Sequence, residues 1–244
     1  MPWSRAPAGT VVIDCFPESA TRYRDGYAIV AIDVIRATTT AVTGVSLGRR
    51  CFPEPTIEAA LVCASLLEQP LLVGELGGNM PFGFDITNSP AELACRSDIH
   101  RPMVLVSSSG TQLIHNACEA EAVYLASFRN YAATAAYLAG RHRRVAVLGA
   151  GTRGEFREED QMCCAWVAAG LLDAGYVVEE RGTANLVDRW RGAHAGACLV
   201  SKSVDYLRRS GQLRDLDFIL EHVNDLAAAF VVKGDEVVLV PVAD

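Results

Sequence analysis

The sequence has little positive charge and no long apolar run. Its 22 Lys and Arg residues are outnumbered by 29 Asp and Glu residues, which gives a formal net charge of −7 at pH 7. Proteins that bind nucleic acid usually present a basic surface, so this balance argues against a nucleic-acid partner. No apolar run is long enough to span a bilayer, and the first residues do not have the pattern of a signal peptide. These absences predict a cytoplasmic protein without a membrane partner.

The sequence also lacks the cysteine and histidine spacing of a metal site. Its eight cysteines include no C-x-x-C pair, and several lie among apolar residues, as in LVCASLL and CCAWVAAGLL. Cysteines in such surroundings are usually buried small hydrophobic residues. The five histidines are scattered along the chain. We therefore expect neither a disulfide framework nor a zinc site.

Half of the residues are hydrophobic, which is enough for a chain of 244 residues to bury a large core. Short runs rich in Val, Ile and Leu predict strands at TVVIDC, YAIVAID, PLLVGE, MVLVSSS, AVYLAS, RVAVLG and YVVEE. Segments with helical spacing lie between them, at residues 56–68, 89–96, 110–120, 130–139 and 155–172. This alternation predicts an α/β fold with three α/β/α layers around a largely parallel or mixed sheet.

The last segment, FVVKGDEVVLVPV, reads differently, because two strand-like runs are separated only by a short polar turn. This pattern predicts a C-terminal hairpin. No low-complexity linker divides the chain. We expect residues 1–244 to form one compact unit, with a bilobed shape as the alternative.

Polar residues directly follow several of the predicted strands. Asp33 and Arg36 follow YAIVAI, and Glu75 follows LLVG. SSSGT follows MVLV, and a glycine-rich turn follows VAVL. In an open parallel sheet, ligands bind beyond the carboxyl ends of the strands. We therefore expect these carboxylates, hydroxyls and guanidinium groups to meet there, as a site for a metal ion and a phosphate would require.

The stretch AIDVIRATTT allows two interpretations. Asp and Thr are common helix caps, which would leave Arg36 as an ordinary surface residue. In the functional interpretation, Asp33 is a hard oxygen ligand for Mg²⁺, and Arg36 beside it holds an anion through two hydrogen bonds.

The stretch GELGGNMPFGFDITNSP is too rich in glycine and proline for a core strand or a long helix. Its end is explained as a capping box, with Ser89 at the N-cap, a proline next and Glu92 three residues after the cap. Capping leaves Glu75, Asp85 and Asn88 unexplained. A helix N-terminus near these residues would also favour an anion.

SSSGT, at residues 107–111, is either an ordinary polar turn with a helix cap or a phosphate-binding loop. In the second case its backbone N–H groups and hydroxyls would converge on phosphate oxygens. It is not a Walker A loop, because the G-x-x-x-x-G-K-[ST] pattern is absent.

VAVLGAGTRGEF is the strongest rival signal. It places G-x-G-x-x-G, at residues 149–154, directly after a strand, and Glu179 or Glu180 ends a later strand, as in a dinucleotide site. However, acidic residues gather where the pyrophosphate would lie, at Glu155, Glu158, Glu159 and Asp160. Carboxylates close to a phosphate loop suit a divalent cation instead.

Taken in order, DVIRATTT, GELGGNMPFGFDITNSP, SSSGT and GAGTRGEFREED resemble the 2-phosphosulfolactate phosphatase family over most of the chain. The resemblance implies an Mg²⁺-dependent phosphatase that converts 2-phospho-3-sulfolactate to 3-sulfolactate and phosphate in coenzyme M biosynthesis. Its partner would be a small anionic phosphorylated substrate, and its cofactor Mg²⁺. A homodimer is one option for the oligomeric state.

The resemblance also implies roles for individual residues. The expected catalytic residues are Asp33, Arg36, Glu75 and Asp85. The expected substrate-binding residues are Thr38, Asn88, Ser89, Ser108, Ser109, Gly110, Thr111 and Arg153. The expected metal ligands are Asp33, Glu75, Asp85 and Asp160.

Mechanism and class are both left open by the sequence. Either Mg²⁺ polarises the phosphoryl oxygens while a carboxylate activates water, or an aspartate, Asp33 first, attacks to form an aspartyl-phosphate. Two other classes compete with a phosphatase. One is a dinucleotide-dependent oxidoreductase that uses the GAGTRG turn, and the other is a non-catalytic anion-binding module.

Overall fold

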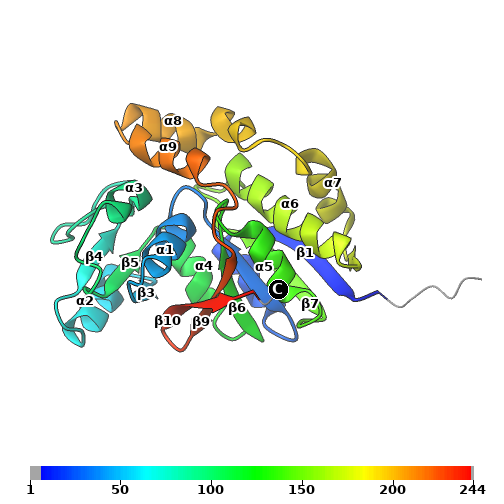
Figure 1. Ribbon diagram of the computed structural model, residues 1–244, viewed down its shortest axis with the longest axis horizontal. Helices are drawn as coiled ribbons and strands as arrows, with labels where there is room; N and C mark the ends of the chain where they lie inside the picture. The colour runs from blue at the N-terminus through cyan, green and yellow to red at the C-terminus, as the bar shows by residue number, and fades with distance from the viewer. Residues whose placement is uncertain (1–6, 243–244) are drawn as a thin grey trace, which may run out of the picture.

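The computed structural model describes residues 7–242, and their strands form a single ten-stranded sheet (Figure 1). The strands are β1 (Gly9–Cys15), β2 (Ala28–Ile32), β3 (Cys51–Glu54), β4 (Leu71–Gly74), β5 (Met103–Val106), β6 (Ala122–Ala126), β7 (Arg144–Gly149), β8 (Tyr176–Val178), β9 (Ala228–Lys233) and β10 (Glu236–Pro241). Their order across the sheet is β4-β5-β3-β10-β9-β6-β2-β7-β1-β8. The first eight strands pair with one another in parallel, and the pairs made by β9 and β10 are antiparallel. The expectation of a largely parallel or mixed sheet is confirmed.

Helices follow most of the strands. The α-helices are α1 (Ala37–Ser46), α2 (Ile57–Ser65), α3 (Pro90–Ala94), α4 (Gly110–Asn116), α5 (Tyr131–Leu138), α6 (Glu158–Asp173), α7 (Arg181–Trp190), α8 (Lys202–Arg209) and α9 (Leu213–Glu221). Two 3₁₀ helices accompany them, η1 (Pro17–Tyr23) and η2 (Ala195–Val200). No helix among residues 7–242 combines the length and the apolar character needed to cross a membrane.

The sheet is covered on both faces, which explains the near-continuous apolar runs of the sequence. In β2, Val30 and Ile32 pack against the side formed by α5 and α6, and Ile29 and Ala31 pack against the side formed by α1 and α4. Every residue of a strand covered on both faces is buried, so apolar residues are favoured at each position. The three α/β/α layers are confirmed.

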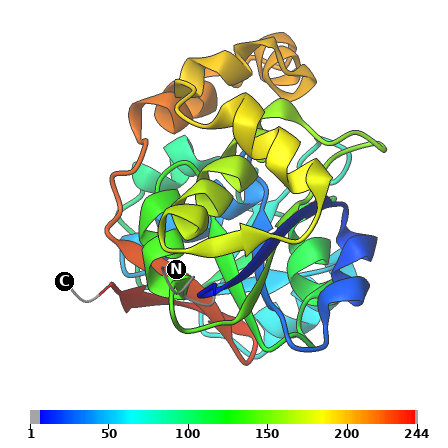
Figure 2. The same cartoon turned by 90° about the vertical axis from the view of Figure 1, so that its right-hand side faces the viewer.

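The C-terminal hairpin is confirmed, and it lies inside the sheet (the red strands in Figures 1 and 2). β10 pairs with β3 through Val237 and Cys51, and β9 pairs with β6 through Val231 and Tyr124. The hairpin therefore joins one group of parallel strands, β4-β5-β3, to the other, β6-β2-β7-β1-β8.

Helices α8 and α9 form a cap at one end of the molecule, the top in Figure 1. α8 begins where the Ser201 side chain accepts a hydrogen bond from the Val204 N–H at 3.2 Å. Val204 and Leu207 of α8 are buried against Leu216 of α9, and α9 in turn packs against α3. The apolar residues of both helices are buried, so their polar residues form a surface above the carboxyl ends of the strands.

Candidate active site

A cavity of about 520 Å³ lies at the carboxyl ends of β2, β4, β5 and β7. The turns after these strands contribute Asp33, Ile35, Arg36, Glu75, Gly77, Gly78, Asn88, Ser107, Ser108, Ser109, Thr152, Arg153, Glu155 and Arg157. Helix α8 contributes Lys202, Ser203, Tyr206, Leu207 and Arg209. A larger hollow, about 840 Å³, lies at the opposite end, where β1 and β7 begin. We take the first as the functional site, because ligands of parallel sheets bind beyond the carboxyl ends of the strands.

Asp33 directly follows β2, and the hydroxyl of Thr38 holds its backbone in place. The Thr38 hydroxyl accepts a hydrogen bond from the Asp33 N–H at 3.0 Å and donates one to the Asp33 carbonyl at 2.8 Å. Thr38 is fully buried, so its hydroxyl shapes the turn and does not reach a ligand. The carboxylate of Asp33 lines the cavity, where the Ser107 hydroxyl lies 3.4 Å from its Oδ2.

Glu75 directly follows β4 and collects four hydrogen bonds. Its Oε1 accepts from the Ser107 hydroxyl at 3.1 Å and from the Ser108 N–H at 2.8 Å. Its Oε2 accepts from the Ser108 hydroxyl at 3.0 Å and from the Gly78 N–H at 2.7 Å. The hydroxyl loop expected to hold phosphate therefore holds a carboxylate of the protein, and Ser109 is the member of the triplet whose side chain this carboxylate leaves free.

The two carboxylates share the hydroxyl of Ser107, which has a single hydrogen to donate. Burial, and then the negative charge of Glu75, raise the pKa of Asp33 to about 7. A fraction of the Asp33 carboxyl groups therefore carries a proton at neutral pH. That proton can be donated to Ser107 while Ser107 donates to Glu75, which satisfies all three groups.

Asp160, in the first turn of α6, lies behind the cavity and not in its wall. It is 4% exposed, and its Oδ1 accepts a hydrogen bond from the Val34 N–H at 2.8 Å. Burial, together with the charges of Glu159 and Asp33, raises the pKa of Asp160 well above its usual value. Asp160, expected as a metal ligand, therefore supports the turn that carries Asp33.

The residues at the cavity fit a magnesium ion that is shared with substrate. No group of three or more His, Cys, Asp or Glu side chains within residues 7–242 is placed to hold a metal ion alone. Asp33 and Glu75, however, both face the cavity and both contact the Ser107 hydroxyl. Mg²⁺ commonly takes one or two carboxylates and completes its shell with water and substrate phosphate. Two neighbouring hard oxygen donors in a buried setting match that requirement.

Arg36 lines the cavity from the start of α1 and forms a buried ion pair. Its Nη1 donates to Oδ2 of Asp215, which comes from α9, and both side chains are 3% exposed. Asp215 was not among the residues expected from the sequence. It belongs to no motif, and its distance of 179 positions from Arg36 gives no local signal.

The N-cap role predicted for Ser89 is confirmed, but half of the capping box is not. The Ser89 hydroxyl accepts from the Glu92 N–H at 3.1 Å and donates to Oδ1 of Asp215. The Ser89 N–H bonds to the Thr87 carbonyl at 2.7 Å, so the Glu92 side chain does not reach back to it. Ser89, expected to bind substrate, does not line the cavity.

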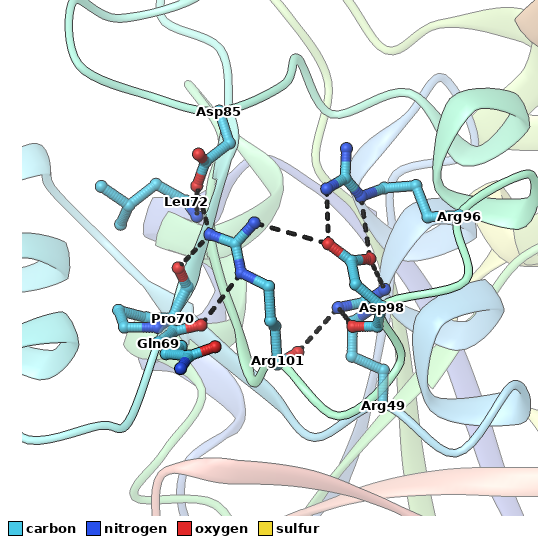
Figure 3. A network of polar contacts seen from close by, with 8 residues as sticks. All are labelled: Arg49, Gln69, Pro70, Leu72, Asp85, Arg96, Asp98 and Arg101. Atoms are coloured by element: carbon cyan, nitrogen blue, oxygen red, sulfur yellow. Dashed lines mark hydrogen bonds and ion pairs between the residues drawn. The ribbon is translucent and has the colours of Figure 1, made fainter.

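Asp85, which was expected to act in catalysis and metal binding, does not line the cavity. Its Oδ2 accepts from the Leu72 N–H at 2.9 Å and from Nη2 of Arg101 at 3.1 Å (Figure 3). β4 is an edge strand, so the N–H of Leu72 has no neighbouring strand on that side. Asp85 supplies the missing partner, as edge strands commonly require.

Gly110 and Thr111, expected to bind substrate, serve the architecture of the hydroxyl loop. The Thr111 hydroxyl accepts from the Ser107 N–H and donates to the Ser107 carbonyl, both at 3.0 Å, and Thr111 is fully buried. A Cβ atom on Gly110 would collide first with Oδ2 of Asp33 and next with the Ala37 Cβ, at 2.6 Å. Glycine is needed there because the starts of α1 and α4 approach closely.

The glycine turn after β7 does not support a dinucleotide site. The first turn of α6 carries three carboxylates, Glu158, Glu159 and Asp160, where a pyrophosphate would need N–H groups and positive potential. Glu179, expected near the ribose, instead accepts hydrogen bonds from Thr10 and Tyr27 at the other end of β1. Arg153, which was expected to bind substrate, does line the cavity.

Positive side chains concentrate at the cavity although the whole chain is acidic. The cationic lining residues are Arg36, Arg153, Arg157, Lys202 and Arg209. The lining carboxylates are Asp33, Glu75 and Glu155, and Glu155 is already paired with Arg157 and Lys202. Reasoning from the sequence missed Arg157 and the residues of α8. Carboxylates that face a group of cations suit the hydrolysis of an anionic ester, so the fold and the site favour a hydrolase of anionic esters as the class of protein.

Comparison with known proteins narrows this class. Residues 15–242 match the model of the 2-phosphosulpholactate phosphatase family, and the chain belongs to that family. It is 33% identical over 230 residues to a probable 2-phosphosulfolactate phosphatase of Deinococcus radiodurans, a match that covers 92% of this chain and 94% of the relative. It is 36% identical over 165 residues to one of Thermotoga petrophila, with coverage of 67% and 66%. It is 33% identical over 164 residues to one of Carboxydothermus hydrogenoformans, with coverage of 67% and 63%.

Proposed function

We propose that this protein is an Mg²⁺-dependent phosphatase that hydrolyses 2-phospho-3-sulfolactate to 3-sulfolactate and phosphate, a reaction of coenzyme M biosynthesis. The observation that carries the proposal is the pair of carboxylates, Asp33 and Glu75, bridged by Ser107 and facing a cationic cavity. The family and the names of the relatives support the substrate.

Asp33 and Glu75 are the residues that would hold Mg²⁺, which supplies a positive charge on the phosphoryl oxygens when it is bound. Four hydrogen bonds fix the orientation of Glu75, and the two that come from the hydroxyls of Ser107 and Ser108 can turn away to free lone pairs for the ion. The backbone bonds to Thr38 do the same for the turn that carries Asp33. Both donors are therefore oriented before substrate arrives, which lowers the cost of organising the site.

A carboxylate at the cavity also has to assist the attack on phosphorus. It can accept a proton from the attacking water, or Asp33 can attack directly and form an aspartyl-phosphate. Arg36 lies in the same wall and supplies a fixed positive charge for the transferring group. Ser109 and Oδ1 of Asn88, which is buried without a hydrogen-bond partner, add polar groups to the cavity.

We assign the acid groups of the substrate to a cationic wall, which consists of Arg153 and Arg157 after β7 and of Lys202 and Arg209 in α8. One phosphate would not require so many cations, whereas a phosphorylated acid with a carboxylate and a sulfonate would engage several of them. The cavity volume, about 520 Å³, is in the range for a small metabolite.

Release of inorganic phosphate tests the proposal. We expect turnover of 2-phospho-3-sulfolactate with Mg²⁺, loss of turnover after metal removal with EDTA, and recovery when Mg²⁺ is restored. Undiminished turnover in excess EDTA after thorough metal removal would contradict the metal dependence. Turnover of a neutral phosphate ester in preference to every phosphorylated acid would contradict the assignment of the cationic wall.

Two matched variants locate the chemistry. Asp33→Asn should lower kcat by a factor of about 10² to 10⁴, because it removes a carboxylate that faces the reacting group. Asp85→Asn, the same change at the edge of β4, should keep the wild-type kcat. The reverse result, with Asp85→Asn inactive and Asp33→Asn active, would move the catalytic centre away from the cavity.

We further propose a cytoplasmic enzyme without a nucleic-acid partner. All eight cysteines are free, as is usual in a reducing compartment, and the net charge is −7. The homodimer stays a prediction, which light scattering coupled to size exclusion would test.

A further inference from the structure

Asp215 joins three segments that lie far apart in the sequence. Its Oδ2 accepts from Nη1 of Arg36, at the start of α1. Its Oδ1 accepts from the Ser89 hydroxyl and, at 3.2 Å, from the Ala91 N–H, both at the start of α3. Asp215 itself is 2% exposed and comes from α9. A single buried carboxylate therefore connects the cap helices to one wall of the cavity.

Arg36 depends on this carboxylate for its position. Within residues 7–242, the bond to Asp215 is the one hydrogen bond found for the Arg36 side chain. A guanidinium that is only 3% exposed is costly without a partner, so losing the carboxylate would drive it out of place. Arg36 also lines the cavity beside Asp33, so its position determines where a positive charge meets the ligand.

We propose that Asp215 is a positioning residue for anion binding. It holds the Arg36 guanidinium against the cavity, so the position of α9 determines where Arg36 lies in the active site. The inference rests on the proposed function only in taking the ligand to be a phosphoryl group. The two carboxylate oxygens of Asp215 have separate partners, since Oδ1 accepts hydrogen bonds from the start of α3 and Oδ2 accepts one from Arg36.

This division of the two oxygens allows positioning to be separated from simple stability. Asp215→Asn keeps an oxygen that can serve Ser89 and Ala91, but it removes the charge that pairs with Arg36. Ser89→Ala removes a contact of Oδ1 and leaves the ion pair intact. Asp217→Asn makes the same chemical change two residues further along α9, at an exposed position.

The first experiment measures the binding of inorganic phosphate by calorimetry in the presence of Mg²⁺, together with the kinetics of phosphate release. Asp215→Asn should weaken phosphate binding by about ten- to hundredfold and lower kcat, because a displaced charge-assisted contact is worth that much. Ser89→Ala should lower the thermal stability without changing the Kd for phosphate. Asp217→Asn should match the wild type in both measurements.

A second experiment covers the case in which Asp215→Asn does not fold. Arg36→Ala removes the guanidinium, and millimolar guanidinium salt should restore phosphate binding, because Asp215 still offers a buried anion for it. Arg36→Ala combined with Asp215→Asn leaves no unpaired charge in the site, and guanidinium should not restore binding there. Because both variants lack the Arg36 side chain, a difference in rescue between them reports on the carboxylate of Asp215.

The outcomes separate this inference from the proposed function. A wild type that binds phosphate but releases none from any ester would contradict the phosphatase proposal. The role of Asp215 would then be decided by the measured phosphate affinities alone. Wild-type phosphate affinity in folded Asp215→Asn would overturn the positioning role. So would equal rescue of the single and double variants, the absence of rescue in both, or a wild type that does not bind phosphate.

Discussion

Single residues around the cavity repeat one structural device. Thr38 accepts from the N–H and donates to the carbonyl of Asp33, and Thr111 does the same for Ser107. Each hydroxyl thereby fixes the first residue after a strand and leaves that residue's side chain free to face the cavity. The side chains that meet a ligand are therefore held by threonines that do not touch it.

The close approach of α1 and α4 makes Gly110 sensitive to substitution. We expect Gly110→Ala to lower the free energy of unfolding by about 1–3 kcal/mol, because the new methyl group would crowd the carboxylate of Asp33 and the Ala37 Cβ. At Gly182, in α7, a methyl group would meet no other atom within 4 Å, so Gly182→Ala should be neutral or stabilising by up to about 1 kcal/mol. Urea unfolding measures both. Equal stabilities for the two variants would contradict the crowding at Gly110.

Asp98 is expected to make stability depend on pH. Hydrogen bonds from Arg96 and Arg49 hold the pKa of Asp98 well below its usual range, and Arg49 is 1% exposed (Figure 3). A carboxyl whose pKa is lower in the folded state stabilises the fold above its unfolded pKa of about 4, and this contribution is lost as the pH falls toward the folded pKa.

Asp98→Asn should therefore lower the free energy of unfolding at pH 7 by about 1.5–3 kcal/mol, the range for hydrogen bonds to charged groups. Urea unfolding at a series of pH values should show the difference from wild type shrinking below about pH 4. Asp205→Asn removes an exposed pair with Arg208 and should cost no more than about 1 kcal/mol. A difference for Asp98→Asn that is the same at pH 7 and pH 3 would rule out its linkage to protonation.

Among the residues expected at the site, those that directly follow a strand line the cavity, whereas within the loop at residues 74–90 Asn88 lines it and Asp85 does not. Asp33, Arg36 and Glu75 reach the cavity because strand ends converge, whatever the details of packing. Asp85 lies in the middle of an irregular loop, and its place was decided by the unpaired N–H of Leu72. Which strand would be the edge strand is a property of the whole sheet, and periodicity does not reveal it.

At the scale of elements, the alternation of apolar runs and helical spacing was sufficient to predict the layers and the C-terminal hairpin. It was not sufficient to place α8 and α9 over the cavity. Their apolar residues, such as Val204 and Leu216, predict a buried face but not the surface that it packs on. The cationic residues Lys202 and Arg209 reach the cavity only through that packing. Five of the nineteen residues that line the cavity come from α8 and therefore depend on tertiary contacts with no local signal.

At the scale of the whole molecule, two features combine. The chain carries a net charge of −7, yet five of its 22 Lys and Arg side chains line one cavity together with only three carboxylates, so an anion is attracted there. The wall with Asp33 and Arg36 follows β2, and the wall with Glu75 and Ser107 follows β4 and β5. These strands belong to different parallel groups, and the hairpin lies between the groups. The geometry of the site therefore depends on the hairpin, although no residue of the hairpin lines the cavity.

We expect a chain ended at residue 227 to lose both its cooperative unfolding and its phosphate binding. β3 and β6 would each lose a partner strand, and the core would lose Phe230 and Val237, which are 0% and 1% exposed. Phe230→Ala, which keeps the strands, should lower the free energy of unfolding by about 3–5 kcal/mol while a single transition is retained. Urea unfolding followed by circular dichroism and by tryptophan fluorescence distinguishes the two cases, because the two signals should separate only in the shortened chain. If the shortened chain unfolds in one transition at the wild-type midpoint, the two groups of strands hold together without the hairpin, and the site does not need it.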